Sequence, residues 1–196
     1  MDDVTGISST MAGAELAREE LGWKYEVKGL GEISLVLGIC IDCDRGAGTI
    51  TILQYMYLEC ILTHYGMSEC SPWSTPLPLS IELTKEQAPA TDVEHHFMKD
   101  KPYCEVLGSV VYAQIATCLD LSYAISMLSK FGSNPSKPHW MALMHVLQYI
   151  KGTLYYKITY ERSGNTSLTP YRYVDADYSC DSSWLEVQWH GEQSIN

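Results

Sequence analysis

The apolar residues of this chain recur with two spacings, which divide it into helical and extended segments. Residues Ser8 to Gly22 are predicted to form a helix, because apolar residues at helical spacing lie between N-cap candidates and a terminal glycine. The same spacing predicts helices over four further ranges: Tyr55–Tyr65, Glu105–Cys118, Asp120–Phe131 and Lys137–Lys151.

Two β-rich runs, Ile33–Ile41 and Thr49–Leu53, are predicted strands, joined by a hairpin turn at Arg45–Gly48. Shorter strands are expected at Tyr155–Glu161 and Thr169–Val174. The proline-rich range 71–90 is predicted to be a linker without regular structure. The pattern of helices and strands predicts an α+β fold.

The composition is that of a globular protein, with 46% hydrophobic and 19% charged residues among 196. Its charge is strongly negative, because 13 basic residues face 24 acidic ones and give a net charge of −11. A protein that grips nucleic acid needs Lys and Arg against phosphates. Taken alone, the charge therefore argues against nucleic-acid binding.

The seven cysteines indicate an intracellular protein, cytoplasmic or nuclear, with reduced thiols. The chain opens with no signal peptide, and we expect no transmembrane segment because no apolar run reaches about 18 residues. Cys40 and Cys43 form a C-x-x-C pair, but strand alternation sends their side chains to opposite faces. We interpret this pair as structural.

Several short sequence boxes follow one another in a fixed order along the chain. They begin with the adjacent carboxylates Asp2 and Asp3, and the later ones are Tyr65–Cys70 with Ser74–Pro78, Tyr103 with Leu107–Ala113, Ser129–Phe131 with Asn134–Pro135 and His139–Trp140, Tyr149–Thr153, and Val174–Tyr178. This order resembles the reverse transcriptase of copia-type retrotransposons, followed by the start of ribonuclease H. It enters that family at the second half of the Tyr-Val-Asp-Asp box.

The resemblance implies four parts: residues 1–53 as the C-terminal remnant of the reverse transcriptase palm, 54–100 as a thumb helix and proline-rich linker, 101–162 as a helical connection region, and 163–196 as the truncated start of ribonuclease H. The family activity is RNA-directed DNA polymerisation with ribonuclease H. The implied partner is an RNA–DNA hybrid or primer–template duplex.

By the same resemblance, Asp2, Asp3 and Asp175 are the catalytic carboxylates and ligands of Mg²⁺. Asp2 and Asp3 belong to the polymerase site, and Asp175 ends the first strand of ribonuclease H. Both sites are incomplete in this sequence, because the family's further carboxylates lie outside it. The chain expressed alone is therefore expected to be inactive and to bind no Mg²⁺.

The implied nucleic-acid contacts are Leu37, Gly38 and Ile39, in the hairpin that packs on the primer terminus of reverse transcriptases, with Lys130 and Lys151. The main alternative is a non-catalytic nucleic-acid-binding or assembly module derived from the thumb and connection. A nucleic-acid-binding protein should have its basic side chains on one face of the molecule. The candidates are Lys24, Lys28, Lys130, Lys137 and Lys151. A third reading is a subunit completed by a palm from another copy.

The low positive charge has its own pattern. At some positions the family commonly carries Arg or another basic residue, whereas this chain has a residue that C-to-T changes make from Arg codons. These residues are Cys40, Cys43, Cys60, Trp73, Cys104, Cys118, His145 and Gln148. We interpret this as decay of a silenced element, with ordinary divergence as the alternative. The first hypothesis predicts that these positions once faced phosphate.

Overall fold

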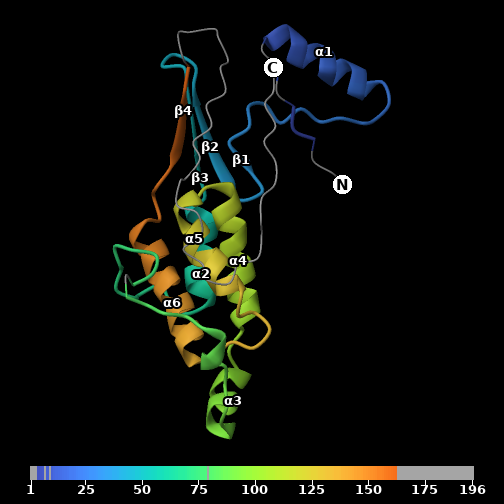
Figure 1. Ribbon diagram of the computed structural model, residues 1–196. Coiled ribbons are helices and arrows are strands. Elements are labelled where there is room, and N and C mark those ends of the chain that lie inside the picture. The colour runs from blue at the N-terminus through green and yellow to red at the C-terminus, as the bar shows by residue number, and fades with distance from the viewer. Residues whose placement is uncertain (1–3, 7, 9, 79, 163–196) are drawn as a thin grey trace, which may run out of the picture. The chain divides into compact units, whose positions relative to one another are not determined.

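The computed structural model describes residues 4–6, 8, 10–78 and 80–162 (Figure 1). Their helices are α1 (Met11–Gly22), α2 (Tyr55–His64), α3 (Asp92–Lys99), α4 (Tyr103–Ala116), α5 (Ser122–Ser129) and α6 (Lys137–Gly152), with short 3₁₀ turns at Lys85–Gln87 and Leu119–Leu121. Their strands are β1 (Leu35–Val36), β2 (Ile39–Asp44), β3 (Thr49–Leu53) and β4 (Ile158–Glu161). The α+β class predicted from sequence is confirmed.

The helix starts follow capping rules that the sequence carries. Thr10 caps α1, because its hydroxyl accepts a hydrogen bond from the Gly13 amide at 3.1 Å. Thr91 and Glu94 form a reciprocal capping box at α3, a helix that the sequence analysis did not predict. Side-chain capping therefore sets the first residue of both helices.

The four strands form one antiparallel sheet in the order β1-β2-β3-β4. Strand β4 returns after α6 to pair with β3, in the register Ile52 with Ile158 and Thr51 with Thr159. The turn predicted between β2 and β3 is present. The predicted continuous strand over 33–41 is wrong, because the chain reverses at Leu37–Gly38 between β1 and β2.

The hydrophobic core lies among α2, α4, α5 and α6, which run side by side in Figure 1. The largest fully buried apolar side chains all come from these helices and the turn before α5: Leu58, Leu62, Val106, Val110, Leu121, Leu128, Leu143, Val146, Leu147 and Ile150. The strands contribute no fully buried side chain among the described residues. The bundle is therefore the stable body on which the sheet rests.

The proline-rich range predicted as a linker packs along α6. The Trp73 amide donates to the Gln148 carbonyl at 3.3 Å, and the His145 ring lies 3.0 Å through Nε2 from the Thr75 carbonyl. Trp73 and His145 also pack ring on ring, with centroids 4.7 Å apart. His145 is buried in this contact, so the expectation that it faces phosphate is wrong.

In the described part of the chain, no helix is long and apolar enough to cross a membrane. The predicted strand at Thr169–Val174 and the region 163–196 lie outside the described residues.

The distribution of buried side chains predicts where the backbone opens last. Amide hydrogen exchange in α4 and α6 should be slower than in β2 and β3, because opening the bundle exposes the core whereas the strands cover no fully buried side chain. Exchange measured by NMR or mass spectrometry tests this order. Slower exchange in the strands than in α6 would contradict it.

His139 makes the stability of the bundle depend on pH. Its ring is fully buried, stacks on Phe131 with centroids 3.9 Å apart, and accepts through Nδ1 from the Ser136 amide at 3.0 Å. Burial lowers the pKa of His139 from its ordinary value, and the Thr84 carbonyl opposes this in part. The folded state therefore holds the imidazole neutral where the unfolded chain takes up a proton.

We expect the free energy of unfolding to fall as pH drops below about 6.5, by at most about 1.4 kcal/mol per pH unit from this group. Urea denaturation between pH 5 and 8 measures the slope. His139→Gln should flatten it, whereas His96→Gln, at an exposed position on α3, should leave it unchanged. Equal slopes in wild type and His139→Gln would contradict the assignment.

Candidate nucleic-acid interface

The reversal between β1 and β2, which we call the hairpin tip, consists of Leu37 and Gly38. Both have positive φ angles, 50° and 76°, and they join the paired residues Val36 and Ile39. Two successive positive φ angles in a two-residue loop are typical of a type I′ hairpin, whose twist matches that of the strands. The left-handed backbone conformation destabilises the protein at Leu37 by about 1 kcal/mol. The Leu37 side chain is nevertheless 78% exposed. An apolar residue in a costly conformation at an exposed point marks the tip as a candidate contact.

The tip is fixed to the bundle by aromatic residues of α2 and α4. The Tyr112 hydroxyl donates to the Leu37 carbonyl at 2.5 Å, and the Tyr112 ring meets the Tyr57 ring edge to face, with centroids 5.0 Å apart. Tyr57 in turn donates to the Ser109 carbonyl of α4 at 3.0 Å. Burial raises the pKa of Tyr57, so that its hydroxyl remains a donor throughout the neutral range.

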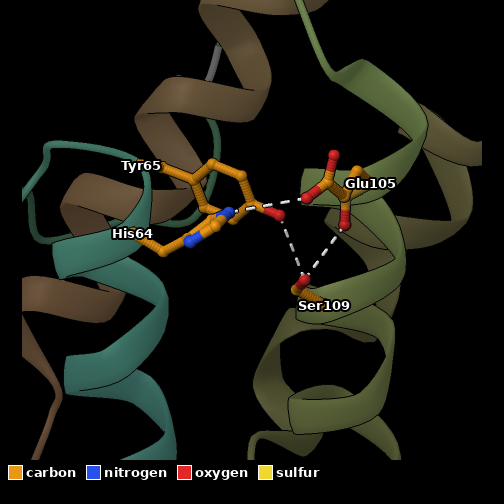
Figure 2. Close-up of polar contacts among 4 residues, drawn as sticks. All are labelled: His64, Tyr65, Glu105 and Ser109. Carbon is orange, nitrogen blue, oxygen red and sulfur yellow. Dashed lines mark hydrogen bonds and ion pairs between the residues drawn. The ribbon is translucent and has the colours of Figure 1, made fainter.

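A second polar cluster joins the far end of α2 to α4 (Figure 2). The Tyr65 and Ser109 hydroxyl oxygens lie 3.3 Å apart, and Ser109 donates to the Glu105 carbonyl at 3.0 Å. His64 approaches the Glu105 carboxylate at 3.5 Å, but both side chains are mostly exposed, so the pair contributes little to stability. These contacts pack the end of α2 against α4.

The two lysines predicted as phosphate contacts lie apart. Lys130 is the C-cap of α5, next to Phe131, which stacks on His139 in the first turn of α6. Lys151 lies in the last turn of α6. Lys151 lies twelve positions after His139, which is about 18 Å along the helix. The two lysines therefore lie at different ends of the bundle and do not form one positively charged cluster.

Sequence reasoning missed Lys101, which lies with the candidate Lys137 at the same aromatic ring where α3 meets α6. The ammonium groups of Lys101 and Lys137 lie 5.5 and 5.4 Å from the centroid of the same Phe97 ring, and Lys101 also lies 5.7 Å from that of Trp140. Each contact is worth about 0.5–1 kcal/mol at an exposed site. The spacing of aromatic and basic residues on α3 and α6 was the available signal, but α3 itself was not predicted.

The candidate carboxylates Asp2, Asp3 and Asp175 lie outside the described residues. Within the described ranges, no group of three or more His, Cys, Asp and Glu side chains is arranged to hold a metal ion. Ile39, the third residue of the predicted contact, begins β2 and is half-buried. The structure thus brings Leu37, Gly38 and Ile39 together but not Lys130 and Lys151.

Several known proteins similar to this chain are Pol polyproteins of transposons. It is 31% identical over 153 residues to the retrovirus-related Pol polyprotein from transposon TNT 1-94 of Nicotiana tabacum, a match that covers 78% of this chain and 12% of the relative. It is 30% identical over 184 residues to the retrovirus-related Pol polyprotein from transposon RE1 of Arabidopsis thaliana, covering 92% of this chain and 12% of the relative. Several relatives of this chain are thus copia-type retrotransposon Pol polyproteins, as the resemblance predicted.

An uncharacterised mitochondrial protein of Arabidopsis thaliana is also similar, with 27% identity over 186 residues, covering 94% of this chain and 69% of that protein. No family model matches the chain, and no solved structure matches it. The matches span 12% of the Pol polyproteins, so the segment corresponds to a small part of those long relatives.

The hairpin tip predicts opposite effects for two glycine substitutions. Gly38→Ala should destabilise the protein by about 1 kcal/mol, because alanine disfavours the positive φ there. Gly108→Ala should stabilise it by about 0.5–1 kcal/mol, because this glycine lies within α4 with open space around its Cβ position. Urea denaturation measures both, and equal signs would contradict the assigned turn.

Proposed function

We propose that the described residues are the part of a copia-type reverse transcriptase that holds the primer–template duplex beside the polymerase site. The parent activity is RNA-directed DNA polymerisation with ribonuclease H. Two observations support this: similarity to copia-type Pol polyproteins over most of the chain and the order of the sequence boxes along it. This segment would bind and position the primer–template duplex. By itself it is not expected to synthesise DNA.

The observation that carries the proposal is an exposed apolar tip on a fixed support. The Leu37 side chain is mostly exposed, yet its backbone is bonded to α4 through Tyr112. A nucleic-acid strand offers apolar surface on its sugars and bases, which side chains contact without neutralising phosphate. A fixed Leu37 can therefore contact a strand end at little further cost in conformational entropy.

The lysines of the bundle would supply a second kind of contact. Lys130 and Lys137 lie toward the start of α6, and Lys151 lies near its end. Phosphate contacts weaken steeply with salt because binding releases counterions. The net charge of −11 opposes them, so we expect weak binding in which the apolar tip carries a large share.

We assign Asp2, Asp3 and Asp175 as Mg²⁺ ligands by family resemblance alone. Mg²⁺ would bring charge neutralisation to phosphoryl transfer or hydrolysis. The proposed grip does not depend on these carboxylates, because the tip and its support are built entirely from described residues.

A second candidate, an assembly module, is favoured by the surface of α1 and the turn after it. None of the residues of α1 is buried, and Leu16 and Trp23 are 61% and 86% exposed. A patch of exposed apolar side chains is typical of a protein–protein contact. Sedimentation of wild type and Leu16→Asp distinguishes the two candidates, because only assembly through α1 makes the mass depend on Leu16.

Leu37→Asn tests the proposed grip while sparing the turn. Asn-Gly is the preferred pair for a type I′ turn, so this variant should be at least as stable as wild type. It removes the apolar side chain, and affinity for an RNA–DNA hybrid with a recessed 3′ end should fall about five- to tenfold. Fluorescence anisotropy with a labelled hybrid measures the affinity.

Leu119→Asn, which replaces another exposed leucine before α5, is the matched control and should bind like wild type. Wild-type affinity in a folded Leu37→Asn variant would contradict the proposed function. An equal loss in both variants would point to a general effect of surface polarity and contradict it too.

A further inference from the structure

One hydrogen bond connects the hairpin tip to the helical bundle across 75 positions of sequence. Its donor is the Tyr112 hydroxyl on α4, and its acceptor is the carbonyl of Leu37 within the turn itself. A bond to the turn rather than to the strands restrains the residue that the proposed function places against nucleic acid. Tyr112 is 38% exposed, so its ring is not simply part of the core.

The Tyr112 ring is itself held by Tyr57 of α2. Tyr57 meets it edge to face at 5.0 Å, and Tyr57 is bonded to the Ser109 carbonyl, one helical turn before Tyr112. The same Tyr57 lies beneath the tip, because a Cβ placed on Gly38 would stand 3.6 Å from the Tyr57 Cβ. Helices α2 and α4 therefore both determine where the Tyr112 hydroxyl points.

The tip has little local support of its own. Strand β1 has two residues, which pair with β2 as Leu35–Cys40 and Val36–Ile39, and one further backbone hydrogen bond runs from the Ile41 amide to the Ser34 carbonyl at 2.9 Å. Leucine at a positive φ angle favours other turn conformations, which would send its side chain elsewhere. Strand β1 is short, and leucine disfavours the conformation of this turn. The hydrogen bond from Tyr112 therefore determines the direction of the Leu37 side chain.

We propose that Tyr112 is a positioning residue that acts through Leu37: its hydroxyl fixes the hairpin tip in the orientation in which Leu37 contacts the end of a nucleic-acid strand. This rests on the proposed function and extends it to a residue that makes no contact with nucleic acid itself. The tip is apolar and carries no charge of its own. Loss of the tether therefore weakens binding without changing its dependence on salt.

Tyr112→Phe tests the inference, because it keeps the ring and its contact with Tyr57 but removes the hydroxyl. We expect affinity for the recessed RNA–DNA hybrid to fall about three- to tenfold, with an unchanged slope of log affinity against log salt. Hydrogen exchange at the Gly38 and Ile39 amides should become faster. Tyr65→Phe is the matched control, since it removes another hydroxyl between α2 and α4 that does not touch the tip, and it should bind like wild type.

The double variant Leu37→Asn/Tyr112→Phe separates positioning from a structural effect. If Tyr112 acts through the Leu37 side chain, the double variant should bind no more weakly than Leu37→Asn alone. Additive losses, or a loss that follows the folded fraction measured by circular dichroism, would overturn the positioning role.

The outcomes for the two proposals differ. If Leu37→Asn weakens binding and Tyr112→Phe does not, the inference fails while the proposed grip stands. If neither folded variant differs from wild type, the proposed grip itself fails, and the inference with it.

Discussion

The packing of α4 against its neighbours is the constraint on which the described structure depends. Val106, Val110 and Ala113 are fully buried along one side of α4, which contacts α2, α5 and α6. Tyr112, adjacent to this buried row, projects instead to the hairpin tip. One helix therefore both closes the core and supports the candidate contact, so a shift of α4 within the bundle would move the tip with it.

The tip itself illustrates how small costs are offset locally. Leu37 adopts a disfavoured backbone, and its side chain remains in water. Gly38 beside it accepts a positive φ angle at little cost, and the bond from Tyr112 opposes the strain. A residue chosen for stability alone would be asparagine, which suits this turn. Leucine offers an apolar contact there that asparagine lacks, which is why the tip carries the proposed function.

Sequence patterns predicted α1, α2, α4, α5 and α6 because their apolar spacing is a local signal, but they missed α3. They missed the reversal at Leu37–Gly38, because an unbroken apolar run from Ile33 to Ile41 hides a turn and leucine gives no turn signal. The pairing of β3 with β4 joins segments about a hundred residues apart, which no local pattern reports. His145 was misplaced because a resemblance that gives this position a basic residue does not say what covers it here, which is the proline-rich segment.

The central claim is that an apolar tip, rather than the lysines, carries much of the grip of this acidic protein on a duplex end. The most direct test is NMR with ¹³C-methyl leucine in the presence of an RNA–DNA hybrid with a recessed 3′ end. The account predicts intermolecular NOEs from the Leu37 methyl groups to sugar protons at the recessed end, with Leu119 unaffected. Binding that shifts no Leu37 methyl signal would contradict it.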